Sequence, residues 1–208
     1  MSRGATARLF VAVDPPLSVR EELTEWARGV AVAARAAGSS RGALRLLNAH
    51  SLHLTLCFLG SRPVGEIEAL ATALTPGAEH ACQLSVGAPL WLPPQRPHAL
   101  AVEIHDHDGE LAHVQAQVSA ALAGVSDWQP ERRRFRAHIT LARLGRSGGH
   151  RRRSSADPFG RDDGERPLPA TPRLSFTPEA IVLYRSWLTR EGARYEALAS
   201  SELVPAGR

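Results

Sequence analysis

The chain has 208 residues, of which 43% are hydrophobic and 22% are charged, and its formal net charge is +4. These values are typical of a globular chain with a substantial core, and they exclude a disordered or fibrous protein. All 25 basic residues are arginine, so there is no side-chain amine for a lysyl-nucleotide intermediate, a Schiff base or a phosphate-loop lysine.

The sequence also limits the cellular setting. No apolar run approaches the roughly 20 residues that span a bilayer, and the N-terminus lacks the apolar core of a signal peptide. A soluble, cytoplasmic protein without membrane contact is therefore expected, as a monomer. Cys57 and Cys82 form neither a zinc-ligand set nor a disulfide framework, and they are predicted to be small core residues.

The predicted elements alternate between strands and helices, which indicates a mixed α and β fold. In chain order they are a strand over residues 7–14, a helix over 18–38, a strand over 52–60, a helix over 65–74, strands over 82–93 and 98–104, a helix over 108–122, and strands over 135–145, 179–188 and 193–204. Residues 145–171 are rich in Gly, Ser, Pro and charge without periodicity. They are predicted to form a flexible surface loop.

Two of these strands have similar sequences, "LHLTLCFLG" from residue 52 and "AHITLARLG" from residue 137. Side chains alternate along a strand, so His53 and Thr55 share one face, and His138 and Thr140 share another. One such strand would most often hold a hydrogen-bonded core histidine. Two copies on symmetry-related lobes instead predict a cleft with two imidazoles and two hydroxyls around one centre.

That centre suits a phosphate group. Threonine hydroxyls donate to its non-bridging oxygens, while one imidazole lies near the attacking oxygen and the other near the leaving oxygen. Histidine titrates near pH 6.5, so one copy can act as general base and the other as general acid without a metal. We expect His53 to protonate the leaving oxygen and His138 to activate water, with the reverse assignment left open.

The paired H-x-T motifs, with "RLFVAVD", "IVLYRS" and "GARYEAL" in the flanking strands, resemble the LigT-like branch of the two-histidine (2H) phosphoesterase superfamily. The resemblance implies an α+β fold over residues 1–208, in one domain of two pseudo-symmetric lobes. Two antiparallel-rich sheets with outer helices would surround a central cleft.

The same resemblance implies an RNA 2′,3′-cyclic phosphodiesterase, with RNA ends or nucleotides as partners, no cofactor and a role in RNA processing. Water would open the cyclic phosphate on its 3′ side and leave a 2′-phosphate. His53 and His138 would be catalytic, and Thr55, Thr140, Arg143 and Phe10 would bind the phosphate and the nucleoside. Strand alternation places Arg143 away from His138, so its role requires a strand end or a bulge.

Other readings stay open at this point. The sequence "HDHD" over residues 105–108 could belong to a metallohydrolase, although Asp106 or Asp108 could instead cap the following helix. A non-catalytic RNA-binding module would keep the cleft without turnover. An ATP-independent 2′-5′ RNA ligase, or another cyclic-nucleotide phosphodiesterase, would use the same four residues.

Overall fold

The computed structural model of the chain describes residues 5–36, 44–74, 82–95, 97–145, 168–189 and 192–203. Its helices are α1 (Leu17–Ala36), α2 (Ile67–Ala73) and α3 (Glu110–Val125), with short 3₁₀ turns at Ala49–Ser51 and Val64–Glu66. Its strands are β1 (Thr6–Val13), β2 (Leu44–Leu46), β3 (Leu54–Pro63), β4 (Leu84–Leu92), β5 (Ala99–Asp106), β6 (His138–Leu144), β7 (Ser175–Phe176), β8 (Ala180–Thr189) and β9 (Gly192–Glu202). Within these ranges no helix is long and apolar enough to cross a membrane.

The strands form one antiparallel sheet in the order β7-β4-β5-β6-β3-β1-β8-β9, and β2 pairs with β6. This order is symmetric about its centre, since β3, β1, β8 and β9 on one side correspond to β6, β5, β4 and β7 on the other. Strand–helix–strand units occupy the matching places, β1-α1-β3 and β5-α3-β6. We call the halves the β1 lobe and the β5 lobe, and their arrangement confirms the predicted bilobal α+β fold.

The two predicted sheets join into one at a single point. The pairing of β3 with β6 consists of one residue pair, Leu54 with Ile139, and these are the middle residues of the two H-x-T motifs. Both side chains are fully buried in the main core. The pseudo-two-fold axis of the molecule therefore passes between the two motifs.

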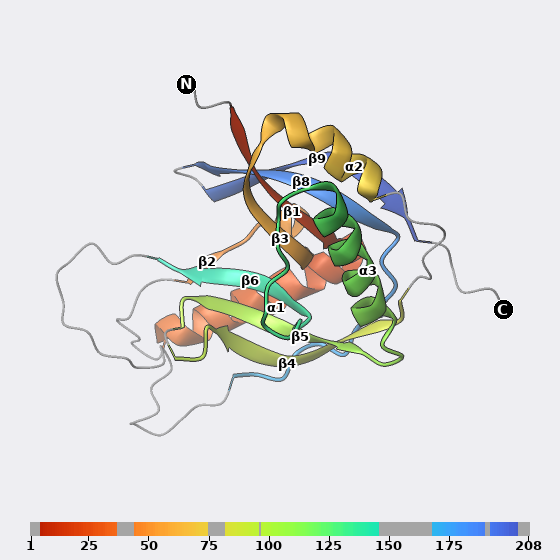
Figure 1. Cartoon of the computed structure of the whole chain (residues 1–208). Helices are drawn as coiled ribbons and strands as arrows, with labels where there is room; N and C mark the ends of the chain where they lie inside the picture. The colour runs from red at the N-terminus through yellow and green to blue at the C-terminus, as the bar shows by residue number, and fades with distance from the viewer. Residues whose placement is uncertain are drawn as a thin grey trace.

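Helices cover the core side of both lobes (Figure 1). Helix α1 packs on β2 and β6, where Val30 and Ala31 meet Leu100 and Ala142 in a small core cluster. Helices α2 and α3 lie side by side, and α3 packs on β3 and β5. Each strand–helix–strand unit thus lays its helix partly on the other lobe, which ties the lobes together beyond their single strand pair.

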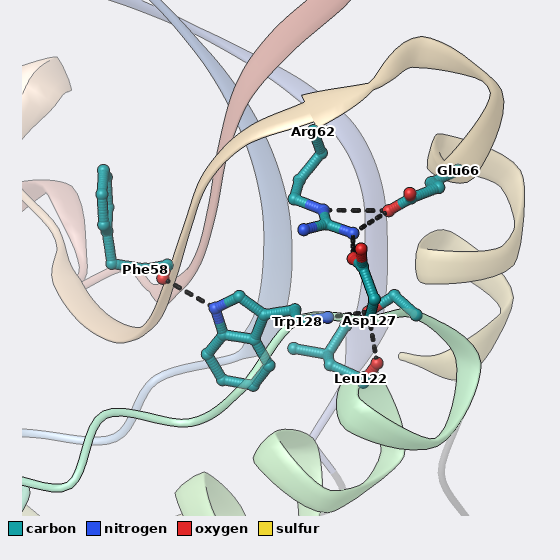
Figure 2. A network of polar contacts seen from close by, with 7 residues as sticks. Phe58, Arg62, Glu66, Leu122, Asp127 and Trp128 are labelled. Atoms are coloured by element: carbon teal, nitrogen blue, oxygen red, sulfur yellow. Dashed lines mark hydrogen bonds and ion pairs between the residues drawn. The ribbon is translucent and has the colours of Figure 1, made fainter.

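A polar cluster fixes the far end of β3 (Figure 2). The guanidinium of Arg62 donates to Glu66, with Nη2 to Oε2 at 2.6 Å, and also to Asp127 just after α3. The indole N–H of Trp128 donates to the carbonyl oxygen of Phe58 at 3.1 Å. The segment that follows α3 therefore fixes the backbone of β3 at Phe58 through a hydrogen bond.

Most predicted elements match the structure within a few residues. Of the predicted surface loop over 145–171, residues 146–167 lie outside the described residues, and 168–171 have no regular secondary structure. Both cysteines are buried, as expected for core residues. Burial raises the pKa of the Cys57 thiol to about 11, so this side chain stays protonated.

Candidate active site

The four motif side chains meet at the junction of the two lobes. Because Leu54 pairs with Ile139 in antiparallel register, the next residues place His53 beside Thr140 and Thr55 beside His138. Leu54 and Ile139 point into the core, so the motif residues point to the opposite side of the sheet, where all four are half-buried. We call this side of the sheet the site face.

Each imidazole is anchored in the same way. Nδ1 of His53 lies 2.9 Å from the carbonyl oxygen of Ser51, and Nδ1 of His138 lies 2.8 Å from that of Arg136. A carbonyl oxygen can only accept a hydrogen bond, so Nδ1 carries the proton in both rings. This fixes the tautomer and leaves Nε2 of each ring to accept or donate a proton at the site.

The surroundings of His53 act on its charge. Burial lowers the pKa of His53 below the ordinary 6.5, and the charges of Arg143 and His138 lower it further. The hydrogen bond to Ser51 and the carboxylate of Asp14 act in the opposite direction. His53 is therefore electrostatically coupled to both the second motif and the nearby arginine.

Arg143 reaches the site face because β6 is bulged. Ala101 of β5 pairs with Thr140, but the next pair is Leu100 with Ala142, so Leu141 is an extra residue on β6. The bulge reverses the alternation, and Arg143, opposite Ala99, shares a face with Thr140. The bulge that this residue requires is therefore present, and the exposed Arg143 projects on the site face.

Phe10 lies at the site within an aromatic cluster. Its ring centroid is 4.7 Å from that of His53 and 5.2 Å from those of Tyr184 and Tyr195. Tyr195 also stands perpendicular to His53 at 5.1 Å. Phe10 is only 4% exposed, and its ring contacts His53. A contact between Phe10 and a nucleoside stays a prediction.

The other end of the cluster is polar. The Tyr184 hydroxyl donates to Oδ2 of Asp14 at 2.6 Å, and Oδ1 of Asp14 is buried without a hydrogen-bond partner among the described residues. Burial raises the pKa of Tyr184, and the hydrogen bond to Asp14 raises it further. The tyrosine therefore stays neutral, and the Asp14 carboxylate lies near enough to act on the pKa of His53.

Sequence reasoning did not identify Asp14, Tyr184 or Tyr195 as site residues. The sequence held one hint of the two tyrosines, since they are the only tyrosines in the chain. Both lie in strands of the β1 lobe. What joins them to His53 is the pairing of β1 with β8 and of β8 with β9, which no local pattern reveals.

The "HDHD" segment lies at the end of β5 and in the turn that follows it. Asp106 accepts from the backbone N–H of Leu111 and Ala112 at the start of α3, as predicted for a helix cap. His107 Nε2 lies 2.7 Å from Ser85 Oγ. Within the described part of the chain, no three His, Cys, Asp or Glu side chains come together as a metal site.

The fold and the paired motifs define a bilobal α+β protein with a two-histidine centre on its symmetry axis. No family model and no curated protein sequence matches the chain. Solved structures do. LigT of E. coli with 3′-AMP matches at a TM-score of 0.70 and 22% identity over 96% of this chain and 99% of LigT. LigT with ATP matches at 0.67, also at 22% identity, over the same shares of the two chains.

A protein of Thermus thermophilus matches at a TM-score of 0.66 and 25% identity, over 96% of this chain and all of that one. The chain thus has the fold of the LigT-like 2H phosphoesterases, which confirms the predicted resemblance at the level of the fold.

Proposed function

We propose that the protein is an RNA 2′,3′-cyclic phosphodiesterase that hydrolyses terminal cyclic phosphates to 2′-phosphates. The observation that carries this proposal is the crossed arrangement at the lobe junction, with His53 beside Thr140 and Thr55 beside His138. It provides two hydroxyls and two imidazoles around one centre, and within the described residues each imidazole is hydrogen-bonded through Nδ1 and not through Nε2. The LigT fold, seen with 3′-AMP, ATP and phosphate bound to LigT, supports a nucleotide phosphate as the ligand.

The reaction follows from these groups. Nε2 of His138 accepts a proton from water as the water oxygen bonds to phosphorus. The bond from phosphorus to O3′ breaks, and Nε2 of His53 gives its proton to O3′. The products are a 2′-phosphate and a 3′-hydroxyl, and the protons on the two histidines then exchange with solvent.

The environment of His53 acts on the acid role in two directions. Because burial lowers its pKa, the protonated form is less populated, but it gives up the proton more readily than an ordinary imidazolium. Asp14 and the bound phosphate anion both favour that protonated form while substrate is present. Thr55, Thr140 and Arg143 then hold the non-bridging oxygens as charge moves through the transition state.

The experiment offers the purified protein 2′,3′-cyclic, 3′,5′-cyclic and linear phosphates and identifies the product isomer by phosphorus NMR. The expected result is turnover of the 2′,3′-cyclic substrates alone, with a 2′-monophosphate product. A 3′-phosphate product would overturn the choice of leaving oxygen. Binding of cyclic phosphates without turnover would favour a non-catalytic RNA-binding module.

A further inference from the structure

Arg8 lies on the site face, next to the aromatic cluster of Phe10, His53, Tyr184 and Tyr195. It lies two residues before Phe10 on β1, so both side chains project on the same face. Its guanidinium carbon lies 4.7 Å from the centroid of the Phe58 ring, which is 40% exposed. Phe58 pairs directly with Phe10 across β1 and β3, and Trp128 holds its backbone (Figure 2).

Tyr195 connects this arginine to the catalytic centre. Tyr195 pairs with Ser186, and Ser186 pairs with Arg8, so the three residues form a row across β9, β8 and β1. The Tyr195 ring reaches from this row to the His53 ring, to which it stands perpendicular. Burial raises the pKa of the Tyr195 hydroxyl, and the charges of Arg143 and Arg8 act in the opposite direction. The positive charges of both arginines therefore act on the position of this hydroxyl.

The charges around Arg8 and Arg143 favour the binding of an anion. No carboxylate of the described residues forms an ion pair with Arg8 or Arg143. Nearby, Asp14 is engaged by Tyr184. An exposed arginine that rests on an aromatic ring and lacks an acidic partner suits a phosphate group, because its planar fork can still donate to phosphate oxygens.

We propose that Arg8 and Tyr195 form a second anion subsite, which binds the phosphodiester on the 5′ side of the nucleotide that carries the cyclic phosphate. The proposal rests on the proposed function. The scissile phosphate lies between the two histidines, and the Phe10 and Tyr195 rings separate it from Arg8, as a ribose separates neighbouring phosphates of RNA. The protein would thus prefer an RNA end to a mononucleotide.

The chain offers a matched control. Arg185 Cζ lies 4.7 Å from the centroid of the Trp187 ring, the same arginine-on-aromatic contact as in Arg8 and Phe58. Arg185 follows Tyr184 on β8, so it projects on the opposite face of the sheet. Replacing it removes the same charge from a similar arginine-on-aromatic contact without touching the site face.

The test compares kcat/KM for adenosine 2′,3′-cyclic phosphate with that for the dinucleotide ApA ending in a 2′,3′-cyclic phosphate. In the wild type the dinucleotide should be favoured, and Arg8→Gln should lower the ratio of the two values on the order of 10-fold. Arg8→Lys should keep part of the preference because it keeps the charge, and Arg185→Gln should keep the wild-type ratio. An unchanged ratio in Arg8→Gln, or an equal change in Arg185→Gln, would overturn the subsite.

Binding separates this proposal from the phosphodiesterase itself. Calorimetry would compare adenosine 2′-monophosphate with ApA carrying a terminal 2′-phosphate. If no cyclic phosphate is hydrolysed but the dinucleotide binds more tightly and Arg8→Gln removes that gain, the subsite stands and the phosphodiesterase proposal fails. Equal affinity of the wild type for both ligands would overturn the subsite even if hydrolysis is observed.

Discussion

His53 and His138 occupy equivalent positions, yet we expect different roles for them. Replacing either histidine by alanine should lower kcat/KM on the order of 10²-fold or more. Thr55→Ala and Thr140→Ala should each cost roughly 2- to 10-fold, because each removes a neutral hydrogen bond. The measurement is steady-state hydrolysis of a 2′,3′-cyclic phosphate.

A leaving group that needs no proton distinguishes the two histidines. With a nitrophenyl phosphodiester of similar shape, the His53→Ala variant should recover a large part of its lost rate, and the His138→Ala variant should not. Recovery by His138→Ala alone would reverse the assignment of acid and base.

The burial of His53 predicts a pH dependence of stability. Its pKa is 6.5 in the unfolded chain and lower in the folded protein, so between these values the unfolded chain binds more protons. The free energy of unfolding therefore rises with pH across this window. The contribution of His53 is fully present above pH 6.5 and is lost as the pH falls through the folded pKa.

Urea unfolding of the wild type and of His53→Gln, from about pH 5 to about pH 8, measures this contribution. The variant should show a weaker pH dependence in the window below 6.5, and titrating groups that do not interact with His53 cancel in the comparison. Equal slopes for the two proteins would show that His53 titrates normally in the folded state.

Among individual residues, sequence reasoning named the two histidines and two threonines, and the family resemblance added Phe10 and Arg143, but neither named Asp14, Tyr184 or Tyr195. Repetition and strand alternation were enough to place His53 with Thr55, because two residues of one strand are fixed relative to each other. Asp14 and Tyr184 are separated by 170 residues, and only the pairing of distant strands brings them together.

The central strands, β3 and β6, meet through one residue pair, Leu54 with Ile139. Ile139→Ala should destabilise the protein by roughly 2–5 kcal/mol, because it leaves a cavity under the strand pair that joins the two lobes. Ile139→Val is the matched control, with an expected cost of about 0.5–1.5 kcal/mol. Chemical denaturation gives both values, and a loss below that of the valine variant would show that the junction adapts to the cavity.

Most elements were predictable from apolar periodicity, but their irregularities were not. The extra residue Leu141 in β6 is apolar and buried, as are Ile139 and Ala142, so nothing in the local pattern distinguishes it. Arg143 therefore appears on the wrong face in a regular strand. The resemblance to a family could suggest the residue, and only the register of β5 with β6 explains how it reaches the site.

The molecule as a whole should work without a metal. We expect activity on 2′,3′-cyclic phosphates to change by less than about twofold after treatment with a chelator, because histidine pairs supply both proton transfers. His105→Ala and His107→Ala should leave the activity unchanged in the same way, since neither residue belongs to the two H-x-T motifs. Activity that is lost with the chelator and restored by a divalent ion would contradict the two-histidine mechanism.

The symmetric strand order also has a consequence for biosynthesis. β1 lies between β3 and β8, and Ser186 of β8 donates to the carbonyl oxygen of Arg8 across 178 residues of chain. A chain emerging from the ribosome forms β1 early, and one edge of that strand stays without a partner until residues 180–189 have been made. Such distant pairing slows folding. Both H-x-T motifs are synthesised well before Tyr184 and Tyr195, so nascent chains carry the histidines before the aromatic cluster that orients His53 can form.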